Sequence, residues 1–309
     1  MYRGYKVVAC IPAGRRRVLE LNLAHLRAQQ GFLDGVMLWQ NTDHTNDRGD
    51  AEFIESQRDG FVCPVPLDER FPSLRPKQLN TGRFYKYTTD PETIYVRLDD
   101  DIVWQHPDAL RNLVDFRISH PEFFVVFANI WNNAVCSALQ WEQGHLESVL
   151  GHGERVNRYC LDPVGWGDPG FAVRLHRLLL ERVAAGTSDG LFVPSLTART
   201  KWNSPLRFSV SCFAWFGSTW AEFDGELDGQ EEEHWISLIH PEEAGVWNAI
   251  CGDALVSHYS FFPQREALDG TDILDRYRVL AEARLHDAYY DMMLVAESWT
   301  PFEVSPWWE

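Results

Sequence analysis

One stretch of this chain constrains the fold more than any other: an apolar, β-prone run that ends in Asp99, Asp100 and Asp101. The run before them, Ile94–Leu98, predicts a buried strand that carries the carboxylates at its C-terminal edge. Adjacent anions repel one another, so a fold that keeps three together is expected to supply a cation. Mg²⁺ and Mn²⁺ take oxygen ligands and leave positions open for phosphate. A solvated acidic turn is the alternative that the tripeptide alone leaves open.

The first forty residues predict the start of a βαβ unit. Residues 5–12 form a β-branched run, residues 18–30 have helical spacing, and residues 35–39 form a second apolar run. Ligands of such sheets bind beyond the carboxyl ends of the strands, so we expect the turns after these two strands to meet at one edge. These turns contain Pro12, Gly14, Arg15 and Asp43. The chain has neither a GxGxxG motif nor a P-loop motif, so a dinucleotide cofactor is poorly supported.

Strands and helices alternate along the rest of the chain. Strands are expected over residues 61–65, 123–130, 207–215 and 254–262, and helices over residues 52–58, 107–119, 171–185 and 272–299. This alternation predicts the α/β class, with helices flanking a mixed sheet and further helices at the C-terminal end. At the end of the strand over 123–130, the carboxamides of Asn129 and Asn132 can fix sugar hydroxyls or form an ordinary polar turn.

Composition excludes several classes of protein. The net charge of −17 argues against a general nucleic-acid binder, and ten carboxylates but no Lys or Arg lie between Phe208 and Gln264. No apolar run reaches the length of a membrane span, and the order of basic and apolar residues at the N-terminus is wrong for a secretory signal. The six cysteines are scattered without a CxxC pair, as in the reduced thiols of a cytoplasmic protein, so they are unlikely to form a zinc site.

Two further features fit the chemistry of an aspartate-bound metal. The run Glu231, Glu232 and Glu233 can supply a general base, which an acceptor hydroxyl needs within hydrogen-bond reach. His258, alone on an apolar strand, can complete the metal shell that bridges the phosphates of a nucleotide donor. A solvated helix start and a satisfied core histidine are the alternatives for these two features.

The order of these pieces resembles a GT-A glycosyltransferase of the bacterial and phage-encoded type. The resemblance covers roughly residues 5–265 and implies a Rossmann-like sheet, a nucleotide-sugar donor with UDP-sugar as the first choice, and Mn²⁺ or Mg²⁺. Asp99-Asp100-Asp101 resembles the DxD motif. In that family's pattern Asp101 ligates the metal, Asp99 contacts the ribose or a water on the metal, and His258 completes the metal site.

The catalytic acidic motif of the family resembles Glu231-Glu232-Glu233. The family's usual aspartate is a glutamate at every candidate position here. The register of the base is therefore open among three neighbours, of which we favour Glu232. We favour an inverting reaction, although the resemblance leaves the stereochemistry open.

The resemblance also implies domains and binding residues. Residues 1–265 form the transferase domain, with a nucleotide-sugar part over 1–105 and an acceptor and catalytic part over 106–265, and residues 266–309 form a helical extension. The expected donor contacts are Pro12, Gly14, Arg15, Asp43, Arg83, Asp99 and Asp100. The expected sugar or acceptor contacts are Asn129, Asn132, Trp131 and Trp235, with Trp166 and Trp202 as further indoles that can stack on a sugar.

The acceptor is left open among a glycan, a small molecule and a hydroxymethylated base in phage DNA. The last would need a basic groove, for which Arg15, Arg83, Lys86, Arg199 and Lys201 are available among the cations. Two other functions remain as alternatives. A nucleotidyltransferase or metal phosphohydrolase also gathers carboxylates around Mg²⁺, and a glycan-binding module would use the tryptophans without a metal.

Overall fold

The computed structural model describes residues 1–41, 49–66, 78–151, 153–225, 227 and 231–296. The chain forms two compact units. The first contains Met1–Asp100, Trp215–Glu232 and Val279–Glu309, and the second contains Asp101–Ala214 and Glu233–Arg278. The boundary between Asp100 and Asp101 therefore falls inside the aspartate triplet.

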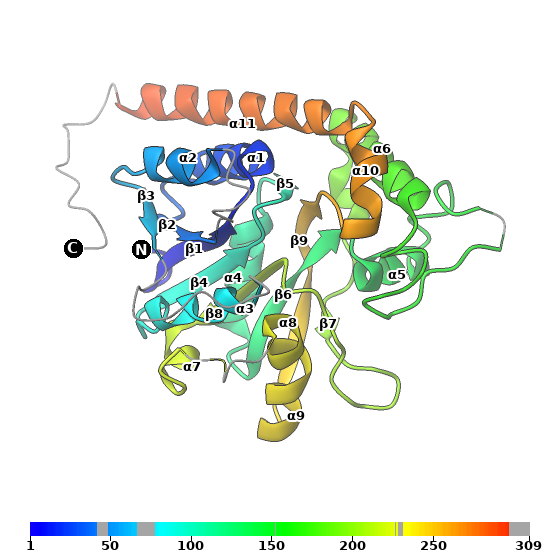
Figure 1. The fold of residues 1–309 in the computed structure, drawn as a ribbon, viewed down its shortest axis with the longest axis horizontal. Coiled ribbons are helices and arrows are strands. Elements are labelled where there is room, and N and C mark those ends of the chain that lie inside the picture. Colours follow the sequence, from blue (N-terminus) through cyan, green and yellow to red (C-terminus); the bar gives the residue numbers. More distant parts are fainter. Residues whose placement is uncertain (42–48, 67–77, 152, 226, 228–230, 297–309) are drawn as a thin grey trace. The chain divides into compact units, whose positions relative to one another are not determined.

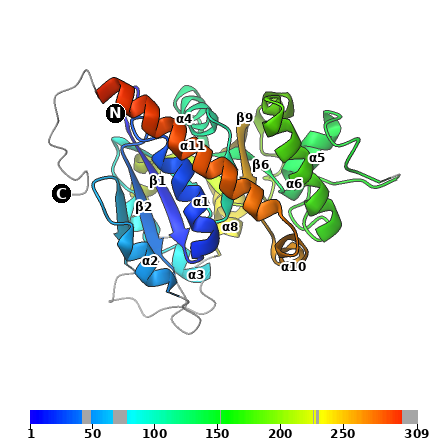
Figure 2. The same ribbon diagram turned by 90° about the horizontal axis from the view of Figure 1, so that it is seen from above.

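The first unit is built on a parallel sheet, as the βαβ pattern predicts. Its strands follow the order β3 (Val62–Val65), β2 (Gly35–Gln40), β1 (Lys6–Ala13) and β4 (Thr93–Leu98). Helices α1 (Arg16–Arg27) and α2 (Asp50–Ser56) follow β1 and β2 and lie on the same face of these strands (Figures 1 and 2). All strand pairs in this set are parallel, so their carboxyl ends share one edge.

Aromatic side chains fill the other face of this sheet. The segments there are α3 (Gln78–Thr81), the 3₁₀ turn η1 (Phe84–Tyr87) and α7 (Gly217–Ala221). The ring of Trp39 stacks on Phe84 at 5.4 Å, and the ring of Tyr85 lies 5.1 Å from that of Trp220 and 5.4 Å from that of Trp215. Offset and edge contacts of this kind are favoured by the charge distribution of aromatic rings. Several of the tryptophans are therefore core residues.

The second unit contains the remaining strands, in the order β8 (Cys212–Phe216, up to Ala214 in this unit), β6 (Phe123–Trp131), β9 (Trp247–His258) and β5 (Ile102–Gln105), with β7 (Leu196–Thr197) also on β9. Strand β6 is parallel to β9 and antiparallel to β8, whereas β5 and β7 are antiparallel to β9. Every residue of β6 after Phe123 is buried, which explains its unbroken apolar sequence.

Helices and short turns make up the rest of the second unit. They are α4 (Ala109–Ser119), α5 (Ala134–Glu142), α6 (Pro169–Ala184), η2 (Ser188–Leu191), the π-helical turn η3 (Trp235–Ile239), α9 (His240–Ala244), η4 (Phe262–Gln264) and α10 (Arg265–Asp269). Helix α8 (Glu232–His234) begins at the last residue of the first unit, and α11 (Ile273–Ala296) passes back into that unit at Val279. Among the described helices, none has both the length and the apolar character needed to cross a bilayer.

The prediction of a mixed α/β fold with C-terminal helices is confirmed, but two local predictions are wrong. The strand expected over 207–215 forms only from Cys212, and residues 207–211 are not regular. Helix α5 was not predicted, because its small and apolar residues give almost no amphipathic contrast; all of its first seven residues are buried. Its start is set by Asn133, whose side-chain oxygen accepts from the amides of Val135 and Cys136.

Gly252 gives a test of packing in the second unit. A Cβ atom at this position would lie 1.7 Å from the main-chain oxygen of Val193. The Val193 amide donates a hydrogen bond to the Gly252 carbonyl at 3.1 Å, which holds the two segments together. We expect Gly252→Ala to lower the free energy of unfolding by about 1–3 kcal/mol in a urea titration, since the backbone must move apart. Gly190→Ala, which meets no atom within 4 Å, serves as the control. Equal stability of the two variants would contradict this packing.

Candidate functional site

A buried arginine organises the end of β4 in the first unit. Arg97 is 4% exposed and lies one residue before the strand ends. Its Nη1 atom lies 2.9 Å from Asp99 Oδ1, its Nε atom lies 2.7 Å from Glu232 Oε1, and its Nη2 donates to Glu232 Oε2 at 3.0 Å. One guanidinium nitrogen thus makes a charge-assisted hydrogen bond to the Glu232 carboxylate, and a second lies close to the other oxygen of that carboxylate. Burial acts against the charge of Arg97, but Asp99 and Glu232 outweigh it and raise its pKa.

Glu232 is 6% exposed and also accepts a hydrogen bond from the Tyr85 hydroxyl. Burial raises the pKa of Glu232 by more than Arg97 and Tyr85 lower it. The same surroundings raise the pKa of Tyr85, first through burial and then through the nearby carboxylate. Tyr85 therefore keeps its proton and acts as the donor in this contact. The arrangement holds one carboxylate, with a raised pKa, in a fixed orientation at the end of the strand.

The two neighbours of Glu232 have different surroundings. Glu231 is exposed, and Glu233, in the second unit, forms an ion pair with Arg207 in which Nε lies 2.7 Å from Oε1. Three consecutive glutamates thus occupy an exposed, a buried and a half-buried position. Of these, Glu232 alone has its carboxylate buried.

Asp100 is turned toward the first strand. Its Oδ2 accepts from the Gly14 amide at 3.1 Å, and the Arg15 guanidinium pairs with its carboxylate, with Nε 3.1 Å from Oδ1. The turn after β1 is thereby fastened to the end of β4. The predicted meeting with the turn after β2 involves Asp43, which is not among the described residues. Gly14 and Arg15 thus contact Asp100, and their predicted contact with a nucleotide sugar stays a prediction.

For the other described residues expected to contact the nucleotide sugar, the structure gives a position but no evidence of binding. Pro12 lies within β1 and is half-buried, and Arg83 is half-buried at the start of the η1 turn. Asp43 lies outside the described residues. Their predicted contacts with a nucleotide stay predictions.

The second unit begins with Asp101, which faces a histidine. Strands β5 and β9 pair so that Ile102 opposes His258, and the Tyr259 amide donates to the Asp101 carbonyl at 2.8 Å. This pairing sets Asp101 Oδ1 3.4 Å from His258 Nε2, with Asp101 2% and His258 4% exposed. The sequence singled out both residues, but the antiparallel register that joins them is visible only in the fold.

The imidazole of His258 is not explained by hydrogen bonds within the described part of the chain. Its Nδ1 is buried and has no hydrogen-bond partner there, and the ring packs against Phe261 with 4.5 Å between centroids. An ion held between Asp101 and Nε2 would not contact Nδ1, so the metal assignment depends on the Nε2 side of the ring. Imidazole and carboxylate are metal ligands, and adjacent ligands of an octahedral ion with bonds of about 2.1 Å lie about 3 Å apart. The pair of Asp101 and His258 therefore has a spacing that fits a divalent ion.

The expected sugar and acceptor contacts are buried in the second unit. The Asn129 amide donates to the carbonyls of Leu191 and Gly252, and the Asn132 amide donates to the Tyr259 carbonyl and to Gln264. The indole of Trp131 donates to Leu175, and Trp235 packs between Phe124 and His240. These side chains hold the unit together, and their predicted contact with a sugar is untested. Trp202 differs, because it is 79% exposed.

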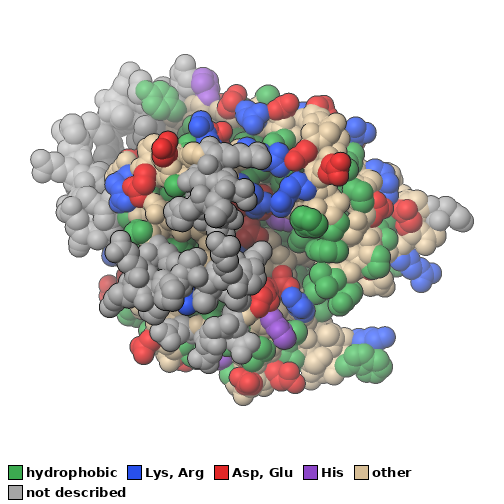
Figure 3. Space-filling view, in the orientation of Figure 1, with side chains coloured by type: hydrophobic (Ala, Val, Ile, Leu, Met, Phe, Trp, Pro, Cys, Tyr) green, Lys and Arg blue, Asp and Glu red, His purple; other side chains and the backbone are tan. Residues whose placement is uncertain are grey.

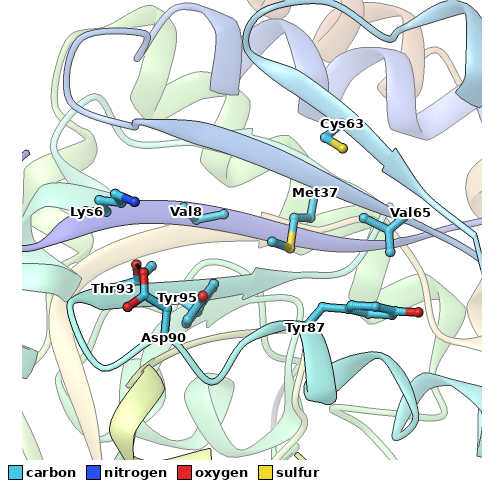
Figure 4. Close-up of a pocket in the computed structure, with 9 residues that line it drawn as sticks. All are labelled: Lys6, Val8, Met37, Cys63, Val65, Tyr87, Asp90, Thr93 and Tyr95. Carbon is cyan, nitrogen blue, oxygen red and sulfur yellow. Dashed lines mark hydrogen bonds between the residues drawn. The ribbon is translucent and has the colours of Figure 1, made fainter. Parts of the chain in front are cut away.

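A cavity of about 310 Å³ lies on the aromatic-bearing face of the first unit's sheet (Figure 4). It is lined by Lys6, Val8, Met37, Cys63, Val65, Tyr87, Asp90, Thr93 and Tyr95. Lys6 and Thr93 are the first residues of β1 and β4, so the cavity reaches the ends of these strands opposite to Asp99 and Asp100. Its lining is mostly apolar and holds none of the predicted site residues.

Arg97 and Tyr85 are the site residues that the sequence interpretation missed. Arg97 carried a signal, since it is the sole charged residue in the otherwise buried strand Thr93–Leu98. A charge in such a strand requires a buried counter-charge, which Asp99 and Glu232 provide. Tyr85 carried no such signal, because its role depends on a contact with a residue 147 positions away.

Removal of the Arg97 charge gives a test of the ion pair. We expect Arg97→Met to lower the free energy of unfolding by about 3–5 kcal/mol, because Glu232 is left buried without its cation. Adding Glu232→Gln to that variant should recover most of the loss, and urea titration measures both. The exposed pair Arg27–Asp59, 2.7 Å apart, gives the control, since Arg27→Met should cost no more than about 1 kcal/mol. An Arg97→Met loss as small as the control would contradict this role.

Comparison with known proteins gives structural similarities alone. No protein-family model and no curated protein matches the sequence. Among solved structures, 4-diphosphocytidyl-2C-methyl-D-erythritol synthase from Anaerococcus prevotii is 18% identical with a TM-score of 0.29, over 40% of this chain and 55% of that one. CMP:2-keto-3-deoxy-manno-octonic acid synthetase in complex with CTP is 12% identical with a TM-score of 0.40, over 82% and 90% of the two chains. Glucosyl-3-phosphoglycerate synthase from Mycobacterium tuberculosis, in complex with Mn²⁺, UDP and phosphoglyceric acid, is 16% identical with a TM-score of 0.34, over 60% and 66%. The chain thus spans just over half the length of the first of these proteins.

Proposed function

We propose that this chain is a metal-dependent glycosyltransferase of the GT-A type, which moves a sugar from a nucleotide sugar, with UDP-sugar as the first choice, to an acceptor hydroxyl. The observation that carries the proposal is the buried pair of Asp101 and His258, in which the carboxylate Oδ1 and the imidazole Nε2 have a spacing that suits a divalent ion. A chain folded without any need for a ligand gains nothing from such a pair, because burying it is costly.

Asp101 and His258 would hold Mn²⁺ or Mg²⁺. Asp99, which is separated from Asp101 by Asp100 along the chain, is the third proposed ligand. The ion would neutralise the diphosphate that leaves with the nucleotide. The turn after β1 is proposed for the donor side, because Asp100 holds its residues Gly14 and Arg15 at the carboxyl end of the sheet. The ribose contact of Asp99 is part of the same proposal.

Glu232 is proposed as the base that takes the proton of the acceptor hydroxyl in an inverting reaction. Burial with Arg97 and Tyr85 fixes the orientation of its carboxylate. A raised pKa brings a carboxylate nearer to the operating pH, where general-base catalysis is most effective. Glu231 is exposed and Glu233 is paired with Arg207, so these two neighbours are the second choices.

Metal binding tests the proposed ligands directly. We expect the full chain to bind Mn²⁺ in calorimetry, and Asp101→Asn to weaken that binding at least tenfold while the circular dichroism spectrum is unchanged. The same variant should lose Mn²⁺-dependent release of nucleoside diphosphate in a screen of nucleotide sugars. His106 and Asp189 form another His–carboxylate pair of the second unit, 2.9 Å apart, so Asp189→Asn is the matched control. Equal Mn²⁺ affinity of Asp101→Asn and the control would refute the assignment.

The base is tested with two neighbouring substitutions. We expect Glu232→Gln to lower kcat by about 10²–10⁴, because the amide takes no proton, and to leave the affinity for Mn²⁺ unchanged. Glu233→Gln should keep kcat within a few-fold of the wild-type value. Steady-state kinetics with the donor found in the screen measures both. The reverse pattern would move the base to Glu233, and release of pyrophosphate instead of nucleoside diphosphate would identify a nucleotidyltransferase.

A further inference from the structure

A rigid turn of the second unit presents a tryptophan to solvent. Trp202 is 79% exposed, yet the turn that carries it is held by its own hydrogen bonds. The Thr200 amide donates to the Ser204 carbonyl at 2.9 Å, and the Thr200 hydroxyl accepts from the amides of Trp202 and Ser204 at 3.2 and 3.4 Å. At the base of the turn, Arg199 Nη1 donates to Asn203 Oδ1 at 3.2 Å. The backbone that carries Trp202 is therefore held by hydrogen bonds, and the Lys201 ammonium lies 4.9 Å from the centre of the exposed indole ring.

This tryptophan borders a groove of about 940 Å³ that lies wholly within the second unit. The groove runs between the C-terminal end of α5 and the segment that carries β7. Its polar lining includes the amides of Gln143 and Asn157 and the hydroxyls of Thr197 and Thr200. Such groups can both donate and accept hydrogen bonds, as the hydroxyls of a sugar require.

The groove is basic in an acidic chain. Its cations are Arg158, Arg199 and Lys201, and its one carboxylate is Glu142, so its formal charge is +2 against −17 for the chain. Arg158 is paired with Glu142, with Nε 2.9 Å from Oε1, whereas neither Arg199 nor Lys201 has an ion pair within the described residues. On the face shown in Figure 3, acidic and basic side chains are interspersed. The groove thus combines a local excess of cations with an exposed indole.

We propose that this groove binds an anionic carbohydrate, a short chain of sugars that carries carboxylate, sulfate or phosphate groups. The Trp202 indole offers a flat apolar surface for a sugar ring, Arg199 and Lys201 offer charge for the acidic group, and the amides and hydroxyls satisfy the sugar hydroxyls. A neutral sugar would offer no anion to Arg199, which donates to Asn203, or to Lys201, which lies over the Trp202 ring. A long nucleic acid needs many cations along its backbone, and the overall charge of −17 opposes it.

The groove is separate from the proposed metal centre of the same unit. Strand β7 pairs with β9 at Ala249 and Ile250, and His258 lies eight residues further along β9 than Ile250. Strand β9 is irregular between Cys251 and Leu255, and the facing strand β6 advances only from Phe127 to Trp131 while β9 runs from Ile250 to Ser257. At about 3.3 Å per residue of β6, the two sites are on the order of 15 Å apart. If the chain is a glycosyltransferase, on which this step depends, the groove holds a part of the acceptor that does not react. An acceptor long enough to reach the groove should then have a lower KM than a short acceptor, and the two acceptors should have the same kcat.

The test is binding of defined oligosaccharides to the full chain without metal or nucleotide. The probes are tetragalacturonate, a heparin-derived tetrasaccharide, a maltotetraose phosphorylated at one end, neutral maltotetraose and the oligonucleotide (dT)₈, each measured by calorimetry and tryptophan fluorescence. We expect at least one anionic probe to bind at least tenfold more tightly than neutral maltotetraose. The probe that binds most tightly then shows which acidic group the groove accepts. Added salt should weaken this binding, because the attraction is between charges.

Substitutions locate the binding in the groove. Trp202→Ala and the double variant Arg199→Ala with Lys201→Ala should each weaken the binding at least tenfold, and the fluorescence change should vanish in the first. Tyr289→Ala and Arg278→Ala, exposed residues of α11, are the controls and should bind as the wild type does. Failure of every anionic probe to bind at millimolar concentration, or wild-type binding by both groove variants, overturns the proposal. So does tighter binding of (dT)₈ than of any anionic sugar.

The two proposals fail in different ways. Asp101→Asn should leave oligosaccharide binding intact, because neither Asp101 nor His258 lines the groove. Binding that is lost in Trp202→Ala but accompanied by no nucleotide-sugar turnover in the wild type would keep the groove and reject the transferase. Turnover that depends on Asp101 without any binding of anionic sugars would do the opposite.

Discussion

The buried charge of Arg97 is the constraint on which the functional end of the first unit depends. A guanidinium that is 4% exposed is tolerated only where carboxylates surround it, since an uncompensated buried charge costs several kcal/mol. Asp99 comes from the same strand, and Glu232 comes from a segment 135 residues later. One charge therefore fixes both the end of β4 and the position at which the later acidic segment returns to the sheet.

The repulsion among the three aspartates is reduced because each carboxylate faces a different partner. Asp99 faces Arg97, Asp100 faces Arg15 and the Gly14 amide, and Asp101 faces His258. The expected cation is thus supplied in part by two arginines. Asp100, whose position gives no obvious chemical task, fastens the first turn of the sheet to the fourth strand. In the proposed function, Asp101 is the member of the triplet that would hold a metal together with His258.

Much of the fold could be predicted from periodicity, and the failures have local physical causes. The strands β1, β2 and β6 and the helix α1 follow clear patterns and formed as predicted. Helix α5 is buried nearly all round, so its sequence lacks the amphipathic contrast that identifies helices. The side chain of Asn133, just after β6, caps that helix. The carboxamides of Asn129 and Asn132 likewise hold neighbouring segments together.

The sequence by itself determined the α/β class and the position of the carboxylates at a strand end, because hydrophobic period and composition are local properties of the chain. The sequence also identified Asp101 and His258 as candidate metal ligands and Glu232 as the candidate base. Only the tertiary structure decided which of the three glutamates is buried, since Arg97 and Tyr85 lie more than a hundred residues away from it. It alone set His258 opposite Asp101, because the register of two antiparallel strands is fixed by packing over the whole unit and not by either strand.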